Sequence, residues 1–224
     1  MSQAYSQVVP EARFLVLGSE GVGKSAVIVR YLTRRFIGEY QSIMELTYTQ
    51  MLRLDEDSTG VTFEIRDTIE RGDISLYESS IRWADAFIVV YSITDKNSFN
   101  TAVQLVEAVY YGKGTDEVHV ALVGNKTDLE HFRTVSKKEG KSAAEQLGCM
   151  FCEVSAAESY ENVQVALNSL FRKVSIHKKC LNEKEKKRNG STSSSSEKKK
   201  YGFGNALFKR KNERKGGQRR IEYI

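Results

Sequence analysis

The stretch Gly18-Ser-Glu-Gly-Val-Gly-Lys-Ser25 contains the residue types that can hold a nucleotide's phosphates. Glycines let a backbone curl so that successive N–H groups point inward and form a nest for an anion. Lys24 adds a mobile cation for the β- and γ-phosphates, and the Ser25 hydroxyl can ligate Mg²⁺. The stretch, called the phosphate loop below, therefore predicts a site for a nucleoside triphosphate with Mg²⁺.

The flanking residues support this interpretation. Arg13–Leu17 has the composition of a short buried strand, and Ala26–Leu32 that of the first turns of a helix. Such a helix directs its positive dipole end at the phosphates. An ordinary turn with a solvated lysine is the competing interpretation, and the strand–loop–helix context argues against it.

A second motif, Asn125-Lys-Thr-Asp128, directly follows the predicted buried strand Val118–Gly124. An ionised Asp128 carboxylate only accepts hydrogen bonds. It would suit guanine, which presents two adjacent N–H donors on one edge. Asn125 can link this segment to the phosphate loop, and the Lys126 stem can cover the base plane. Alone the motif also makes an ordinary turn, but beside a phosphate loop it indicates a guanine nucleotide.

Hydrophobic periodicity predicts strands that alternate with helices. This order favours an α/β fold with a six-stranded, mostly parallel sheet, one antiparallel edge strand and helices on both faces. The predicted strands and helices after the phosphate loop are hairpin strands Thr47–Leu54 and Val61–Asp67, helix Leu76–Ala84 with Leu76, Ser80 and Trp83 on one face, strand Ala86–Tyr91, helix Lys96–Tyr110, strand Val118–Gly124, helix Ser136–Leu147 capped by Ser136, strand Met150–Ser155, and helix Glu161–Ile176 with Val165, Leu167, Leu170, Phe171 and Val174 as its apolar face.

Charge is unevenly distributed along the 224 residues, whose net charge is +5. Residues 178–224 hold 16 Lys and Arg against 5 Asp and Glu, and the preceding residues hold 18 against 24. We expect a short lead-in at 1–10, one domain at 11–178 and a disordered basic tail at 179–224. An intracellular protein is expected, because the three cysteines are an odd number and neither a signal peptide nor a membrane-spanning apolar run is visible.

From Ala12 to Lys178 the chain resembles the Ras-superfamily small GTPases, and their P-loop NTPase G domain is the fold that this implies. The resemblance is carried by Gly18–Ser25, Asp67-Thr68, Asn125–Asp128 and Ser155-Ala156. Residues 25–40 and 86–95 look most similar to the branch of the Ras-related estrogen-regulated growth inhibitor and of Ras-like proteins without a prenylation box. The chain ends Ile-Glu-Tyr-Ile224, so we expect it to be non-prenylated.

The resemblance implies how GTP or GDP would be held. Phe36 would pack against guanine, the Ala156 N–H would meet the guanine O6 atom, and Asp67 would hold Mg²⁺ through water. The implied nucleotide contacts are Gly18, Ser19, Glu20, Gly21, Val22, Gly23, Lys24, Ser25, Ala26, Phe36, Asp67, Thr68, Asn125, Lys126, Asp128, Leu129, Ser155, Ala156 and Ala157, with Ser25 and Asp67 at the metal.

Departures from the family pattern cluster around the γ-phosphate. Lys24 is retained as a catalytic residue, but Arg71 replaces the glutamine that orients the attacking water. Glu70 replaces a glycine whose N–H meets the γ-phosphate, and Ser42-Ile43 stands where the family has Pro-Thr. Glu20 adds bulk and negative charge near the same phosphate. We therefore expect slow GTP hydrolysis, unless Ser42 or Gly72 restores a lost contact through a shifted register.

The leading hypothesis is a monomeric GTPase that regulates signalling or growth and binds effectors and exchange factors through residues 36–48 and 67–80. The alternative is a guanine-nucleotide-binding scaffold whose tail carries the binding function. The basic and aromatic segment Lys198–Lys211 fits anionic lipid, nucleic acid or an import receptor, and a solvated tail without a specific partner is the bland interpretation. We expect the protein in the nucleus, nucleolus and cytoplasm. Reversible association with the inner plasma membrane is the alternative, and palmitoylation of Cys180 would be a further way to attach it there.

Other reactive residue types are better explained by packing. Cys149 and Cys152 have CxxC spacing but lack a second pair, so core packing is favoured over zinc binding or redox chemistry. His119 falls in a buried strand and is expected to be structural. His131 and His177 are expected to be exposed.

Overall fold

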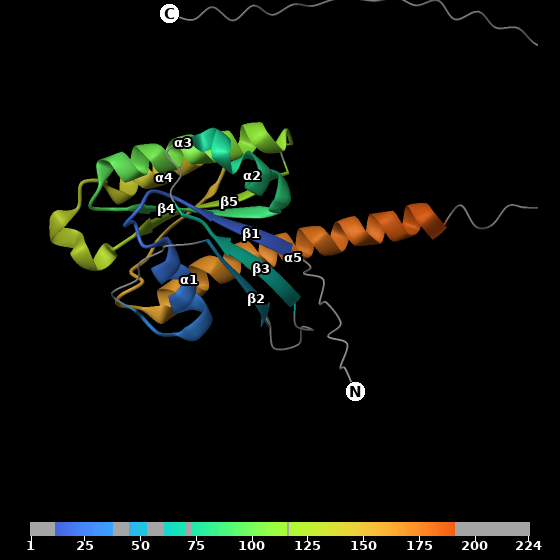
Figure 1. The fold of residues 1–224 in the computed structure, drawn as a ribbon, viewed down its shortest axis with the longest axis horizontal. Coiled ribbons are helices and arrows are strands. Elements are labelled where there is room, and N and C mark those ends of the chain that lie inside the picture. Colours follow the sequence, from blue (N-terminus) through green and yellow to red (C-terminus); the bar gives the residue numbers. More distant parts are fainter. Residues whose placement is uncertain (1–11, 38–44, 53–60, 70–72, 116, 191–224) are drawn as a thin grey trace, which may run out of the picture.

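The computed structural model describes residues 12–37, 45–52, 61–69, 73–115 and 117–190. Within these ranges six strands form one sheet in the order β2-β3-β1-β4-β5-β6 (Figure 1). Neighbouring strands are parallel except β2 and β3. The elements in chain order are β1 (Ala12–Leu17), α1 (Lys24–Thr33), β2 (Leu46–Leu52), β3 (Val61–Asp67), η1 (Ile74–Tyr77), α2 (Glu78–Trp83), β4 (Ala86–Ser92), α3 (Lys96–Lys113), β5 (His119–Asn125), η2 (Thr127–Phe132), α4 (Lys137–Leu147), β6 (Met150–Glu153) and α5 (Tyr160–Gly190).

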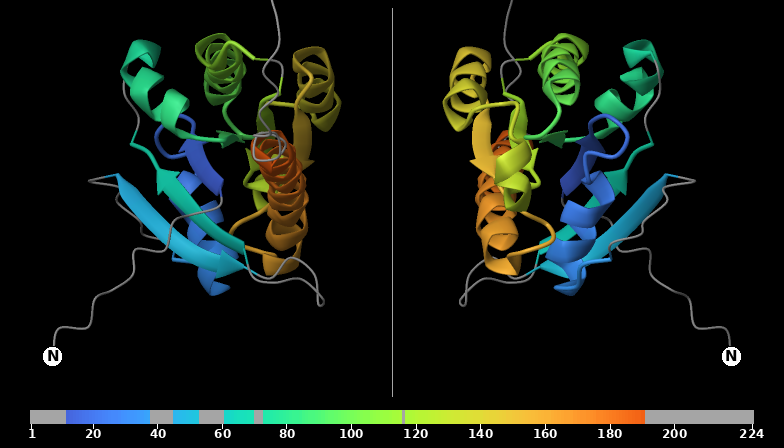
Figure 2. Two further views of the ribbon diagram at one scale, coloured as in Figure 1. Left: turned by 90° about the vertical axis from the view of Figure 1, so that its right-hand side faces the viewer. Right: turned by 90° about the vertical axis from the view of Figure 1, so that its left-hand side faces the viewer.

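Helices cover both faces of the sheet, as Figure 2 shows. Helices α1 and α5 pack on one face, and α2, α3 and α4 pack on the other. Strand β4 lies near the middle and is buried along its whole length, which explains its continuous apolar sequence. The predicted α/β fold with an antiparallel hairpin at one edge is confirmed.

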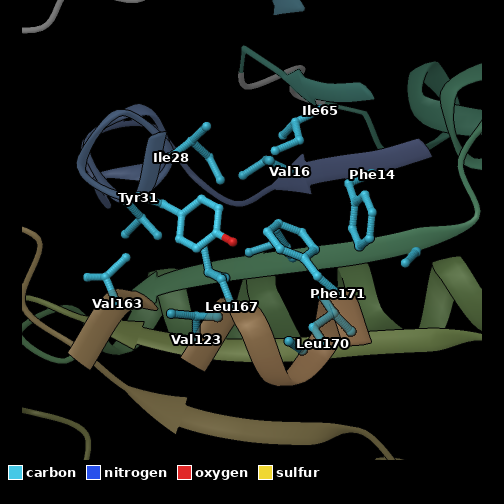
Figure 3. Packing of buried hydrophobic residues seen from close by; sticks show 14 of the residues in the cluster. Phe14, Val16, Ile28, Tyr31, Ile65, Val123, Val163, Leu167, Leu170 and Phe171 are labelled. Atoms are coloured by element: carbon cyan, nitrogen blue, oxygen red, sulfur yellow. The ribbon is translucent and has the colours of Figure 1, made fainter. Parts of the chain in front are cut away.

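Aromatic side chains form the core between the sheet and α5 (Figure 3). The rings of Phe14 and Phe171 meet edge to face with centroids 4.5 Å apart. The Tyr31 hydroxyl, at the rim of this core, donates to Asn168 Oδ1 at 2.6 Å. One predicted core position is wrong, because Val165 is 67% exposed, whereas Val163 is fully buried. Positions 163, 167, 170, 171 and 174 follow the helical period, and residue 165 lies off that face.

The end of α5 also differs from the prediction. The sequence predicts a helix to Ile176 and a disordered tail from residue 179, but α5 continues to Gly190. Lys, Glu and Arg dominate residues 178–188 and are good helix formers, so a helix persists where little apolar surface is available for burial. Among the described residues, α5 included, no helix is both long and apolar enough to cross a bilayer.

Two shorter elements deviate from their predicted form. The predicted helix Leu76–Ala84 is split into η1 and α2, and its buried face contains Tyr77, Ser80 and Ile81. Leu76, which was placed on the apolar face, is 52% exposed. Strand β6 ends at Glu153 rather than at Ser155, which leaves Ser155 in the loop that follows.

The cysteine and histidine positions fit a structural role with one correction. Cys149 packs against the core beside α2–α4 and Cys152 against the core beside α5, so the two thiols lie on opposite faces of the sheet. Burial raises the pKa of Cys149 to about 11 and that of Cys152 to about 12, which disfavours thiolate chemistry. His177 is half-buried rather than exposed, with Nδ1 2.9 Å from His119 Nε2.

Two valines of α5 provide a matched test of this packing. Val163→Ala should lower the free energy of unfolding by about 2 kcal/mol, because it removes two fully buried methyl groups. Val165→Ala makes the same chemical change at an exposed position and should change stability by less than about 0.5 kcal/mol. Urea denaturation followed by circular dichroism measures both values. Equal losses would contradict the described face of α5.

Candidate functional site

The phosphate loop connects β1 to α1 at the carboxyl end of the sheet. Strand order reverses between β1 and β4, and open α/β sheets bind their ligands at this point. Gly18 has φ 141°, and a Cβ there would collide with the Val90 carbonyl oxygen of β4. Gly23 has φ 91°, and a Cβ there would collide with Asn125 Nδ2. These two glycines therefore let the loop lie directly against its neighbours.

Lys24 and Ser25 form the start of α1, and both side chains are buried. Lys24 Nζ donates to the carbonyl oxygens of Gly18 and Ser19, each at 2.9 Å, so the ammonium group is held across the mouth of the loop. The unpaired N–H groups of a helix start carry partial positive charge. A buried cation in front of a helix N-terminus makes this a site for an anion such as a phosphate.

Asp67, the last residue of β3, faces the same loop. The Ser25 hydroxyl hydrogen-bonds to the Asp67 carboxylate. Burial raises the pKa of Asp67, although the Ser25 bond and the Lys24 charge oppose this shift. Oδ1 of Asp67 is buried and finds no hydrogen-bond partner within the described residues. A buried carboxylate oxygen beside a hydroxyl matches the oxygen ligands that Mg²⁺ prefers, so these two residues fit the metal.

Thr68 anchors the segment that leaves β3. Its hydroxyl donates to the Val16 carbonyl oxygen of β1 at 2.7 Å, and the side chain is buried. This bond fixes the chain direction immediately after Asp67.

Asn125 joins the phosphate loop to the two segments expected to hold the base. Its Nδ2 donates to the Val22 carbonyl oxygen at 2.9 Å, and its Oδ1 accepts from the Ala156 N–H at 3.1 Å. The side chain is 2% exposed, so both hydrogen bonds are shielded from water. The contact with Val22 is the link that the sequence predicts for this residue.

Asp128 and Ser155 complete the base-side geometry. The Ser155 hydroxyl donates to Asp128 Oδ1 at 2.6 Å and accepts from the Glu158 N–H at 3.0 Å. Ser155 is buried and Asp128 is exposed, so a rigid donor orients a carboxylate that faces solvent. Lys126 adopts φ 71°, a left-handed conformation that turns the chain between Asn125 and Asp128.

The structure thus brings together most of the predicted site. The segments that meet are Gly18–Ser25, Asp67-Thr68, Asn125–Asp128 and Ser155-Ala156. Glu20 lies exposed in the turn of the phosphate loop. Phe36, Leu129 and Ala157 are described and exposed, and Ala26 is half-buried. The predicted γ-phosphate positions Ser42, Ile43, Glu70, Arg71 and Gly72 lie outside the described residues.

One residue of this region is missed by the sequence analysis. Arg133 follows η2 and forms an ion pair with the buried Glu153 of β6, with Nη1 2.8 Å from Oε1. An acidic residue among the mainly apolar residues of the predicted strand Met150–Ser155 is the signal that could have indicated a partner cation, because buried charges are paired.

Comparison with known proteins agrees with this geometry. Residues 13–176 match the model of the Ras family. The chain is 40% identical to the Ras-related and estrogen-regulated growth inhibitor of Bos taurus, over 73% of this chain and 81% of that protein. It is 39% identical to the Ras-like protein family member 11A-like of Danio rerio, over 73% of this chain and 67% of that protein. It is also 39% identical to the Ras-related and estrogen-regulated growth inhibitor-like protein of Bos taurus, over 80% of this chain and 88% of that protein.

Two glycines with positive φ offer a matched test of the site. Gly23→Ala should weaken binding of a fluorescent GDP analogue at least about tenfold, because its methyl group displaces Asn125 from the phosphate loop. Gly148→Ala, at φ 70° in open space, carries a similar backbone cost of about 1 kcal/mol without a collision. It should leave the dissociation constant within about twofold of the wild-type value. Similar losses in both variants would contradict the role given to the close approach at Gly23.

Proposed function

Because the chain belongs to the Ras family, we propose that it binds GDP and GTP with Mg²⁺ and hydrolyses GTP slowly. The observation that carries the proposal is the buried Asn125 amide, which bonds the phosphate loop and the Ala156 backbone at once. This arrangement fixes the spacing between a phosphate site and a carboxylate for the base. Asp128 selects guanine, because its oxygens accept from the two adjacent donors on the guanine edge.

Ser25 and Asp67 would hold the metal. When bound, Mg²⁺ would supply positive charge against the negative charge of the phosphates. Lys24 supplies a second positive charge from the start of α1. Asp67 orients the Ser25 hydroxyl, and the burial of both keeps bulk water from these oxygens.

Slow turnover follows from the residues around the γ-phosphate. Arg71 and Glu70 replace the residues that orient water and contact the γ-phosphate in the family pattern, and Ile43 replaces a metal-ligating threonine. Glu20 is exposed in the turn of the phosphate loop, where an activating arginine would approach. Water orientation and an arginine finger together contribute about 10⁵-fold in Ras stimulated by its activator. This chain retains the means to hold the nucleotide, and the means to cleave it are reduced.

A switch role in signalling is proposed from the family and from the names of relatives that are growth inhibitors. A ligand shifts a conformational equilibrium only as far as its affinity differs between the two states. With the threonine and glycine of the family pattern replaced, GTP and GDP should differ less in their contacts with residues 36–48 and 67–80. We therefore propose a switch whose two states differ less in effector binding than those of Ras.

The nucleotide on the purified protein tests this function directly. We expect about one guanine nucleotide per chain by chromatography after denaturation. Single-turnover hydrolysis of GTP should proceed on the order of 10⁻⁴ s⁻¹ or more slowly, the range of unstimulated Ras. A rate of several per second would contradict the proposed slow turnover. Bound guanine nucleotide with no hydrolysis over days would instead favour the scaffold, and adenine nucleotide would contradict the assignment of the base.

Removal of Mg²⁺ tests the metal residues. In the wild-type protein, EDTA should accelerate GDP release at least about tenfold, because the phosphates would lose the positive charge of the metal. Asp67→Asn should release GDP rapidly with or without EDTA, since it keeps the side-chain shape and removes the charge. Asp95→Asn is the control: Asp95 caps α3, and asparagine caps helices equally well. If EDTA accelerates release in Asp67→Asn as much as in the wild type, the metal role of Asp67 is wrong.

A further inference from the structure

The guanidinium group of Arg133 forms as many hydrogen bonds as it has N–H donors. Nε and Nη2 donate to the two carboxylate oxygens of Glu130 at 2.8 and 2.7 Å. Nη1 and Nη2 donate to the two oxygens of Glu153 at 2.8 and 3.1 Å, and Nη1 also donates to the Val135 carbonyl oxygen at 2.9 Å. One planar cation therefore bonds two carboxylates and the Val135 carbonyl oxygen in a fixed geometry.

These partners belong to the two segments that would contact the base. Glu130 lies in η2 two residues after Asp128, with a kink at Leu129 between them. Glu153 ends β6 and is followed by Val154 and Ser155. Arg133 thus joins the segment that holds the proposed base-selecting carboxylate to the strand that leads into Ser155 and Ala156. The Arg133 hydrogen bonds involve none of the groups that are proposed to contact the base. They connect the same two segments that the Ser155–Asp128 hydrogen bond connects.

We propose that Arg133 is a positioning residue that sets the discrimination between guanine and other purines, acting through Glu153 and Glu130. The inference rests on the proposed binding of guanine nucleotides. Arg133 holds η2 and the end of β6 at the separation at which the Ser155–Asp128 hydrogen bond can direct the Asp128 carboxylate toward the base. If that separation changes, the hydrogen bond from the exocyclic amino group of guanine to Asp128 should weaken. The contacts that all purine nucleotides share should weaken less.

The two carboxylates contribute unequally. The side chain of Glu153 is 6% exposed and that of Arg133 17%, whereas Glu130 is 62% exposed. A buried carboxylate that loses its cation is strongly destabilised, while an exposed ion pair contributes little. The contact between Arg133 and Glu153 therefore provides most of the positioning, and Glu130 aligns the outer edge of the guanidinium group.

The surroundings leave little room for this pair to shift. A Cβ on Gly124 would lie 2.8 Å from the Tyr91 hydroxyl and 3.1 Å from Cγ of Glu153. The Tyr91 hydroxyl is buried, and the described part of the chain offers it no hydrogen-bond partner. Burial and the nearby Glu153 charge raise the pKa of Tyr91, so its side chain stays neutral and packs closely beside the pair. Gly124 and Tyr91 thus confine Glu153 on one side, and its hydrogen bonds with Arg133 determine its position on the other.

Binding of GDP and of inosine diphosphate tests the proposal. Inosine diphosphate differs from GDP in lacking the exocyclic amino group that Asp128 would accept from. Arg133→Met should lower GDP affinity at least about tenfold and lower the ratio of GDP to inosine diphosphate affinity at least about fivefold. Arg133→Lys should restore part of the ratio, since an ammonium group can pair with Glu153 but cannot bond both carboxylates in one plane.

Two further variants separate positioning from folding. Lys141→Met removes an exposed cation paired with Glu145 on α4 and should leave both affinities unchanged. If Arg133→Met fails to fold, Arg133→Met combined with Glu153→Gln removes both buried charges and should fold, with the lowered ratio retained.

The outcomes distinguish this proposal from the proposed function. An unchanged ratio in every folded Arg133 variant overturns the positioning role, even if GDP affinity or thermal stability falls. Failure of the wild-type protein to bind GDP overturns the proposed function itself. A lowered ratio with near-normal thermal stability supports positioning, because a purely structural loss weakens both nucleotides alike.

Discussion

The buried amide of Asn125 joins loops that are far apart in the chain, and the nucleotide edge of the sheet depends on it. Its two hydrogen bonds connect the turn after β1 to the turn after β6, with β5 between them. Both ends of the amide are used and water is excluded, so neither hydrogen bond can be replaced cheaply by solvent. Gly23 of the phosphate loop serves the same constraint, since a Cβ there would collide with Asn125 Nδ2.

Around this link the site divides into two parts of different character. The base side contains hydrogen-bonded side chains from η2 and from the loop after β6. The ion pair between Arg133 and Glu153 of β6 lies next to them. The phosphate side contains Lys24, Ser25 and Asp67, which are buried and mutually oriented. The family pattern is kept in these residues, and its replacements fall at Glu20, Ile43, Glu70 and Arg71. In the proposed function, retention of the nucleotide and its cleavage would therefore depend on separate sets of residues.

Sequence patterns predicted most of the strands because burial on both faces imposes a continuous apolar run. The hairpin and the Ser136 cap were likewise local signals, and the structure contains both. The end of α5 was not predictable from core formation, because a helix of good formers continues without burying its surface. The ion pair of Arg133 with Glu153 depends on two segments brought together by the sheet. Spacing along the chain carries little information about such a contact.

The length of α5 has a mechanical consequence for whatever engages the chain after it. Among the α5 side chains that the structure describes, the last buried one is Ser175, and the helix is described as far as Gly190. At about 1.5 Å per residue, the part between them extends for roughly 20 Å, and Figure 1 shows it projecting past the sheet. A partner bound to the exposed end of α5 would therefore lie about that far from the sheet, because a helix is a stiff spacer.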